Sequence, residues 1–473
     1  RSLHNIINQL ENHHYQPKTL NDQLAREITT TLFTNLDPYH SLLSQMDLVR
    51  FDILKIELDD MLHSGELGLI NDLFNLIHQR RLEFARYSLS LVEPTLYGFN
   101  FALDESLYID RSEQPWPKNS TALRELWRRQ VKHEVLTGHL EGESNQIIQD
   151  RLAKRYHYLY KRLLQYNNND AFEQLVQSYA AVIDPHTQYY SPRQLENFNI
   201  DMSLSLEGIG AVLQRDNDYI KVVRLVPAGP ADKPGELKAA DHIVGVAQGQ
   251  QGEMVDVVGW RLDDVVQLIR GPKGSLVRLQ IIAANNQDKS RTEIQIIRNT
   301  VTLEEQSARS SLINIDWGDT RYRMGIITIP TFYHDFDAQQ AGNSNYKSTS
   351  RDVKAILQQL QQEQVAGIIV DLRNNGGGSL NEANKLTGLF IARGGTVQIR
   401  GINGRIDVLG DPNAEISYAG PLVVLVNRLS ASASEIFAGA IQDYQRGLVI
   451  GSQTFGKGTV QSMIPMQHGK LKL

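Results

Sequence analysis

Three short segments in the last third of the chain contain residues that could do covalent chemistry. The first, residues 430–435, reads Ser-Ala-Ser-Ala-Ser-Glu and falls between a predicted strand and a predicted helix. A helix N-terminus presents free N–H donors and the positive end of the helix dipole, which favour developing negative charge. Ser432 is therefore a candidate nucleophile, with small alanine neighbours that would let a peptide approach. Its spacing to Glu435 also fits the S-x-x-E capping box, so a purely structural role remains open.

The second segment, residues 451–459, nearly matches the nucleotide-binding pattern G-x-x-x-x-G-K-[ST]. Gly458 replaces the hydroxyl residue that would bind magnesium, and residues 460–465 resemble a strand where the pattern requires a helix. These two departures disfavour nucleotide binding. A lysine between glycines at a strand end can instead reach inward, and burial lowers the pKa of an amine toward neutrality. Lys457 is thus a candidate general base.

The third segment, residues 371–379, places three consecutive glycines directly after a strand of the buried type. Glycines permit positive φ angles and leave their N–H groups uncovered by side chains. Such N–H groups can bind an oxyanion or a phosphate. A tight turn without any chemical role is the alternative interpretation of this segment.

The serine and lysine hypotheses support each other. A serine nucleophile needs a base, and residues 335–466 contain no histidine, while His334 and His468 lie outside in contexts that suggest no role. A Ser-Lys pair is an established variant of the catalytic triad. The three segments together therefore predict hydrolysis, with Ser432 attacking and Lys457 taking its proton.

The elements around these segments alternate between strands and helices. Strands are expected at 325–329, 367–372, 421–426 and 448–450, helices at 353–362 and 433–444, and a polar loop at 339–350. This order is typical of a layered α/β domain, and each of the three segments follows a predicted strand. Sites in open α/β sheets lie at such strand ends.

The two regions before this domain differ in residue composition and in the spacing of their apolar residues. Residues 1–200 predict helices, because apolar residues recur at helical spacing, as in Leu24, Ile28, Leu32 and Leu36. Loops are expected at residues 112–117 and 167–170. From about residue 204 to 298 glycine and β-branched residues become frequent. Strands are predicted at 219–223, 243–246 and 277–282, and one helix at 262–270.

Composition limits the possible functions. The chain has 473 residues, 41% of them hydrophobic, a formal net charge of -6 and no cysteine. Disulfides, thiolate catalysis and cysteine-based zinc sites are therefore excluded, and nothing in the composition favours nucleic-acid binding.

No apolar run is long enough to span a bilayer. The N-terminus lacks an apolar signal core, so the protein is expected to be cytosolic or to have lost a signal. The strand-like alternation at residues 470–473 suggests that the chain is truncated.

With these segments and elements, the sequence resembles the C-terminal processing, or tail-specific, serine proteases, and most closely their bacterial periplasmic members. The resemblance runs from about Leu36 to the end of the chain. It rests on five stretches that follow one another along the chain. They are residues 184–192, 206–211, 371–378, 430–437 and 454–461. Family members continue past residue 473 with further protease strands and a helical region.

The resemblance implies roles for individual residues. Ser432 would be the nucleophile and Lys457, twenty-five positions later, the general base. The backbone N–H groups of Gly378 and Ala433 would hold the oxyanion. Asp443 corresponds to an acidic position that is important in close relatives. Eleven residues of helix rise about 16 Å, which is too far for Asp443 to touch Ser432, so it is expected to support structure. Glu435 is nearer and would orient the lysine or cap the helix.

The resemblance also implies how substrates are recognised. A PDZ-like domain would receive the C-terminal carboxylate of a protein on a loop, and apolar tails would be favoured. This tail-binding set comprises Leu206, Gly208, Ile209, Gly210 and Ala211. No metal, nucleotide or other cofactor is needed.

The predicted fold class is multidomain α+β. It comprises a helical N-terminal domain (1–200), a PDZ-like β-rich domain (201–299) and a crotonase/Clp-protease-like α/β Ser-Lys protease domain (300–473), incomplete at its C-terminus. The family precedent suggests the periplasm, envelope proteins as substrates and an adaptor that binds the helical region. The alternatives are an inactive PDZ scaffold or chaperone on a protease fold, and acyl transfer, which would require a coenzyme A site.

Overall fold

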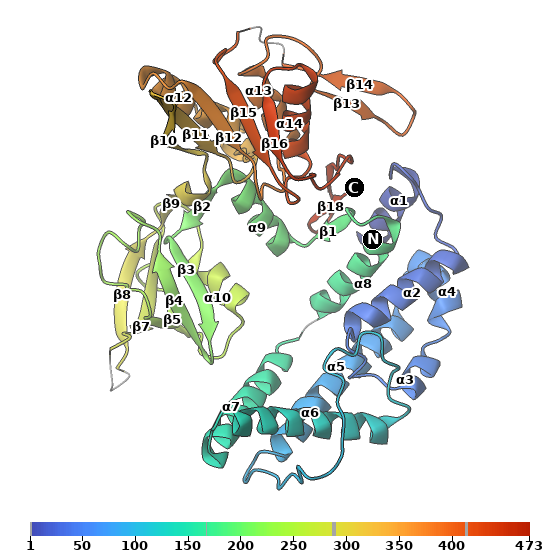
Figure 1. The fold of residues 1–473 in the computed structure, drawn as a ribbon. Coiled ribbons are helices and arrows are strands. Elements are labelled where there is room, and N and C mark those ends of the chain that lie inside the picture. The colour runs from blue at the N-terminus through green and yellow to red at the C-terminus, as the bar shows by residue number, and fades with distance from the viewer. Residues whose placement is uncertain (1, 167, 286–289, 412–414) are drawn as a thin grey trace.

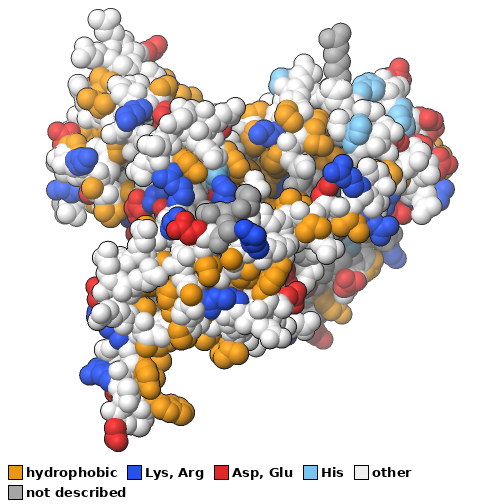
Figure 2. Space-filling view, turned by 90° about the horizontal axis from the view of Figure 1, so that it is seen from above, with side chains coloured by type: hydrophobic (Ala, Val, Ile, Leu, Met, Phe, Trp, Pro, Cys, Tyr) orange, Lys and Arg blue, Asp and Glu red, His pale blue; other side chains and the backbone are white. Residues whose placement is uncertain are grey.

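The chain folds into a helical region, a small β-rich domain and an α/β domain (Figure 1). The computed structural model describes residues 2–166, 168–285, 290–411 and 415–473. The predicted fold class, multidomain α+β with these three parts in this order, is confirmed. None of the helices in these ranges is both long enough and apolar enough to cross a membrane. On the face seen in Figure 2, acidic and basic side chains are interspersed among hydrophobic ones.

The helical region packs its helices around a core of aliphatic side chains. The four regularly spaced residues of the second helix, Leu24, Ile28, Leu32 and Leu36, are all buried there, as their spacing predicts. The helices are α1 (Ser2–Asn12), α2 (Asp22–Leu36), α3 (Gln45–Arg50), α4 (Leu54–Ser64), α5 (Gly68–Ser90), α6 (Ser120–Leu140), α7 (Asn145–Leu163), α8 (Asn168–Ile183) and α9 (Pro192–Ser203).

Of the two loops predicted in this region, one is confirmed and one is wrong. Residues 112–117 are irregular, as expected. The polar run 167–170 is not a loop, because α8 begins at Asn168, while residue 167 lies outside the described residues. Asn and Asp are also favoured at helix N-termini, so the composition of a loop and of a helix start is similar here.

The β-rich domain contains an antiparallel sheet in the order β3-β4-β5-β7-β8, with β3 at one edge. The single predicted helix is α10 (Leu262–Ile269), which contacts β3 and β5. A separate pair, β2 with β9, joins the start and end of the domain. The strands are β2 (Ser205–Gly208), β3 (Ala211–Asp216), β4 (Tyr219–Leu225), β5 (His242–Gln248), β6 (Val255–Asp256), β7 (Leu276–Ile282), β8 (Thr292–Ile297) and β9 (Asn299–Thr302).

The α/β domain has a five-stranded sheet in the order β10-β11-β12-β15-β16, parallel from β11 onward. Three helices share one core with the sheet, because side chains such as Leu357, Leu386 and Phe437 pack with Ile368 and Val424. The elements are η1 (Glu304–Gln306), β10 (Arg309–Trp317), β11 (Thr320–Thr328), α11 (Phe336–Gln340), α12 (Thr349–Gln362), β12 (Gly367–Asp371), α13 (Leu380–Gly388), β13 (Val397–Arg400), β14 (Ile406–Leu409), β15 (Leu422–Val426), α14 (Ala433–Asp443) and β16 (Leu448–Gly451).

The last strands pack on the helical region rather than on this sheet. β17 (Met463–Pro465) and β18 (Lys470–Lys472) form a small sheet with β1 (Gln188–Tyr190). Leu471 is fully buried in the core of the helical region. The C-terminus accordingly lies near the N-terminal helix in Figure 1. The expected strand at 460–465 begins only at Met463, and the polar loop expected at 339–350 is confined to residues 341–348.

Candidate active site

Ser432 immediately precedes α14 and adopts an unusual backbone conformation. Its φ of 55° and ψ of -111° lie where non-glycine residues are rarely found and cost energy. Gly377 packs against this turn. A Cβ on Gly377 would lie 2.9 Å from the Ser432 Cβ and 2.9 Å from the Ala431 carbonyl oxygen. Glycine is therefore required at position 377 if Ser432 is to keep this position.

Buried hydrogen bonds fasten the serine segment to the glycine-containing segment. The Ser430 hydroxyl donates to the Leu372 carbonyl at 2.8 Å, and the Ser434 hydroxyl donates to the Asn375 carbonyl at 2.9 Å. The Ala431 N–H donates to the same Asn375 carbonyl at 3.0 Å. The two small serines that flank Ser432 thus hold the turn in place, which explains the repeated serines of this segment.

Two backbone N–H groups near this turn, those of Gly378 and Ala433, have no acceptor among the residues that the structure describes. Gly378 pairs with Phe332 in a parallel bridge, in which Phe332 donates to the Gly377 carbonyl at 2.9 Å and Ser379 donates to the Phe332 carbonyl at 2.8 Å. The N–H of Gly378 itself points to the other side in such a bridge. In the described ranges, neither this N–H nor that of Ala433 makes a hydrogen bond. Such a pair of donors can hold an oxyanion.

Glu435 connects the nucleophile to the lysine segment. Its Oε2 accepts the N–H of Ser432 at 2.7 Å and that of Lys457 at 3.0 Å, and its Oε1 accepts the N–H of Gly456 at 2.6 Å. Burial raises the pKa of Glu435, but the hydrogen bonds from Gly456, Thr454, Ser432 and Lys457 outweigh it and lower the pKa below its usual value. The capping box expected from the sequence is formed.

Within the described residues, the Lys457 side chain makes no hydrogen bond to Ser432. It is partly exposed, and among the residues that the structure describes its amine makes no hydrogen bond. Burial and the positive charge of Lys457 lower the pKa of Lys472 in β18, so two ammonium groups interact here. The structure brings together Ser432, Gly378, Ala433 and the main chain of Lys457, but the contact needed for proton transfer is not formed.

Asp443 lies apart from this site. It is the last residue of α14, whereas Ser432 precedes the first residue of that helix, and its side chain is exposed. The separation of about 16 Å expected from helix geometry therefore holds. No cluster of potential metal ligands occurs within the described parts of the chain.

The five predicted tail-binding residues form one continuous turn. Leu206 and Gly208 belong to β2, and Ala211 begins β3. Between them, the carbonyls of Ile209 and Gly210 accept hydrogen bonds from Ala231 and Val226 at 2.9 and 2.8 Å. These bonds fix the turn through its carbonyls, and α10 lies alongside the edge strand β3. An extended peptide could add to this edge.

One buried pair near the site was not predicted. Glu382 is completely buried and contacts His334, which is 2% exposed, at 2.8 Å. The sequence analysis assigned no role to His334. A signal was available for Glu382, because Ser379 and Glu382 also have the S-x-x-E spacing, directly after the glycines.

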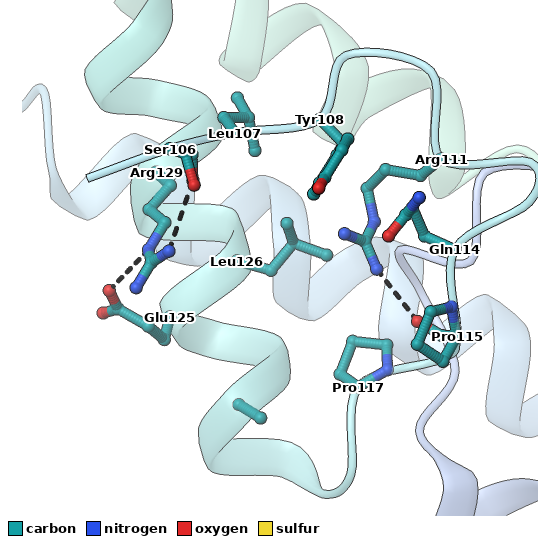
Figure 3. A pocket seen from close by; sticks show the side chains of 11 residues that line it. Ser106, Leu107, Tyr108, Arg111, Gln114, Pro115, Pro117, Glu125, Leu126 and Arg129 are labelled. Atoms are coloured by element: carbon teal, nitrogen blue, oxygen red, sulfur yellow. Dashed lines mark hydrogen bonds and ion pairs between the residues drawn. The ribbon is translucent and has the colours of Figure 1, made fainter.

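A separate pocket of about 370 Å³ lies in the helical region, between α6 and the loop before it (Figure 3). Arg111 and Arg129 line it. Arg111 donates to the Pro115 carbonyl at 3.0 Å, and Arg129 donates to the Glu125 carboxylate at 3.0 Å. None of the predicted site residues lines it.

Comparisons with known proteins match three consecutive parts of the chain to three family models. Family models for the tail specific protease N-terminal domain, the PDZ domain and peptidase family S41 match residues 6–193, 198–282 and 323–472. A tail-specific protease of Haemophilus influenzae is 39% identical over 454 residues, which cover 95% of this chain and 61% of that protein.

Two further relatives resemble parts of the chain. The chloroplastic C-terminal processing peptidase of Tetradesmus obliquus is 33% identical over 307 residues, covering 63% of this chain and 61% of that protein. A solved PDZ domain of a carboxy-terminal protease from Vibrio cholerae, in complex with a peptide, is 49% identical and covers 21% of this chain and 99% of that chain, with a TM-score of 0.20. The chain spans about three fifths of the length of the curated relatives it matches.

Proposed function

Since this chain belongs to the tail-specific, C-terminal processing protease family, we propose that it is a serine endopeptidase that recognises the C-terminal tails of its substrates. The observation that carries the proposal is the position of Ser432 at the start of α14 and against Gly377, with N–H groups of Gly378 and Ala433 that find no acceptor among the described residues. A nucleophile between two such donors is the arrangement that stabilises a tetrahedral intermediate.

The reaction begins when an apolar C-terminal tail adds to the edge of β3. The N–H groups of Ile209 and Gly210 receive its carboxylate, while their carbonyls stay bonded within the domain. The uncharged amine of Lys457 takes the proton of Ser432, whose oxygen attacks a peptide carbonyl, and Gly378 and Ala433 hold the oxyanion. The lysine then protonates the leaving amine, and water hydrolyses the acyl-enzyme.

Before the first step, the Lys457 amine must approach the Ser432 hydroxyl. The main chains of both residues are held by the same carboxylate, that of Glu435. The movement that remains is therefore chiefly that of the lysine side chain, which has four rotatable bonds.

The substrates would be proteins with apolar C-termini, delivered in the periplasm, with an adaptor on the helical region as a further partner. The second candidate function is that of a PDZ scaffold or chaperone without catalysis. The observation that favours this second function is that the Lys457 amine makes no hydrogen bond to Ser432 within the described residues.

Cleavage of a fluorogenic peptide with an apolar C-terminus, together with fluorophosphonate labelling, separates the two functions. Ser432→Ala should abolish both signals. Lys457→Ala should lower kcat by about 1000-fold or more, because loss of the base leaves only the oxyanion donors. Lys354→Ala, which removes an exposed lysine of α12, is the matched control and should keep wild-type activity. Equal cleavage by wild type and Ser432→Ala would refute Ser432 as the nucleophile, whereas no cleavage and no labelling of wild type would favour the scaffold.

A further inference from the structure

The α/β domain contains a fully buried carboxylate, that of Glu382, which the proposed reaction does not use. Its Oε1 faces His334 Nδ1 at 2.8 Å. Its Oε2 accepts the Ser348 hydroxyl at 2.6 Å and both the N–H and the hydroxyl of Ser350 at 2.8 Å. Burying a carboxylate is costly unless it is paired and hydrogen-bonded, so these contacts tie the first turn of α13 to His334 and to the start of α12.

Glu382 stands at the beginning of α13, directly after the glycine loop, defined as residues 376–378. Ser379 caps this helix, because its hydroxyl accepts the Glu382 N–H at 3.3 Å. The Ser379 N–H in turn donates to the Phe332 carbonyl, which closes the bridge that orients Gly378. The position of Glu382 is therefore coupled to the N–H of Gly378 through only three residues of main chain.

His334 is coupled to the other side of the same bridge. It follows Phe332 by two residues, and its second ring nitrogen, Nε2, lies 2.8 Å from Gln339 Oε1. Its ring also packs on Phe336, with centroids 4.1 Å apart. The ring is thus fixed on both sides, and any shift of Phe332 along Gly378 would strain the contact between His334 and Glu382.

The main chain of His334 reaches a third element. Its N–H donates to the Met202 carbonyl at 2.7 Å, near the end of α9. This helix leads directly into β2 of the PDZ domain, and its Asn197 side chain accepts from Arg270, the residue after α10, at 3.1 Å. The buried pair therefore lies between the glycine loop and the helix that carries the tail-binding domain.

We propose that His334 and Glu382 are positioning residues for the oxyanion donor Gly378, holding the glycine loop against Phe332 in register with Ser432. This inference rests on the proposed function for its catalytic consequence. Neither residue touches the substrate. Each acts through the bridge between Phe332 and Gly378, and loss of the pair would leave the nucleophile in place while the donor opposite it becomes mobile.

The test compares Glu382→Gln with a matched control, Thr387→Val. Thr387 is also buried in α13, and among the described residues its hydroxyl bonds only within that helix, to the Ala383 carbonyl. Amide hydrogen exchange gives a readout that needs no activity. Glu382→Gln should accelerate exchange at the hydrogen-bonded N–H groups of Gly377 and Ser379 by at least about 10-fold, and Thr387→Val should not. Unchanged exchange in Glu382→Gln would overturn the proposal.

Kinetics test the catalytic consequence. Glu382→Gln should lower kcat about 10–100-fold with KM within about 2-fold, because complete removal of one oxyanion donor costs about 100–1000-fold. A peptide aldehyde, which forms a tetrahedral adduct with Ser432, should lose affinity by a similar factor, while the same peptide as an amide should bind Ser432→Ala equally well with or without Glu382→Gln. Equal kcat losses in Glu382→Gln and Thr387→Val would overturn the proposal.

If Glu382→Gln does not fold, His334→Gln is the second variant, since it keeps the Ser348 and Ser350 contacts of the carboxylate. It should show the same pattern with a smaller loss, and wild-type exchange and kcat in a folded His334→Gln protein would overturn the proposal. A wild-type chain that cleaves no peptide would refute the proposed function instead, and hydrogen exchange of the glycine loop would still decide the role of the pair.

Discussion

At the scale of single residues, two carboxylates control the geometry around Ser432. Glu435 collects three main-chain N–H groups and so sets the distance between the serine and lysine segments. Glu382 follows the glycine loop in sequence and is satisfied by four donors, from His334, from Ser348 and twice from Ser350 at the start of α12. Glu382 is fully buried and Glu435 is occupied by three main-chain N–H donors, so both are expected to act by position.

Glu435→Gln should lower kcat about 10–100-fold. An amide in place of the carboxylate presents N–H donors where main-chain N–H donors already converge, so at least one of the three bonds is lost. Steady-state cleavage of the fluorogenic peptide measures the effect. Glu363→Gln, at the residue after α12, removes a charge that pairs with Arg323 at 2.8 Å. It is the control and should retain full activity. A wild-type kcat in Glu435→Gln would show that the lysine loop is held by other contacts.

The burial of Glu382 predicts a pH dependence of stability. Burial raises the pKa of Glu382, but hydrogen bonds from Ser348, Ser350 and His334 lower it overall below the usual 4.5. The unfolded chain therefore binds more protons at this site, and the contribution of Glu382 to stability is complete above about pH 4.5 and is lost as the pH falls through the folded-state pKa. Urea unfolding between pH 6 and pH 3 should show a steeper loss in wild type than in Glu382→Gln. Parallel curves for the two proteins would contradict this account.

At the scale of elements, the tail-binding turn depends on the conformation of one glycine. Gly210 has a φ of +74° and lies next to Val301 of β9, where a Cβ would approach to 3.3 Å. A side chain disfavours this region of φ, so it would rotate the peptide between Ile209 and Gly210 away from the incoming carboxylate.

Gly210→Ala should therefore weaken binding of a fluorescent apolar-tailed peptide by at least about 10-fold and destabilise the domain by about 1–3 kcal/mol. Gly249→Ala is the matched control, because Gly249 also has a positive φ, of +61°, but faces open space away from the turn. The control should lose stability without losing affinity. Equal affinity in both variants would place the carboxylate site elsewhere.

At the scale of the whole molecule, the first and last segments of the chain stabilise each other. β18 pairs with β1 in antiparallel register, and Leu471 enters the core of the helical region. The PDZ domain, in contrast, meets α7 through polar contacts such as Lys161 with Asp218 at 3.0 Å and Arg215 with Tyr158 at 2.8 Å. Polar contacts of this kind permit movement between domains more readily than a buried apolar interface does.

Leu471→Ala should destabilise the helical region by about 2–4 kcal/mol, although the substitution lies two residues from the C-terminus, because it leaves a cavity in a distant core. Hydrogen exchange in α2 and α8, which line that core, should accelerate. Val460→Ala is the control, since Val460 is 50% exposed, and should leave exchange unchanged. Unchanged protection in Leu471→Ala would show that the helical region folds independently of β18.

Most of the secondary structure could be predicted from local sequence, and local sequence also selects the candidate site residues. Apolar spacing determines the helices, alternation and β-branched runs determine the strands, and the three glycines and the small residues around Ser432 are recognisable because each has few physical alternatives. Where local composition is compatible with two structures, as in the polar run that begins α8, the prediction fails because helix N-termini and loops favour the same residues.

Only the tertiary structure decides how these residues meet. The carboxylate of Glu435 bridges segments more than twenty positions apart, His334 finds Glu382 across 48 residues, and β18 joins β1 across the length of the chain. The sequence determined which groups are chemically competent, since that depends on residue type and immediate neighbours. Which donors stay unpaired, and how far the Lys457 amine lies from Ser432, depends on contacts between distant segments that no local pattern encodes.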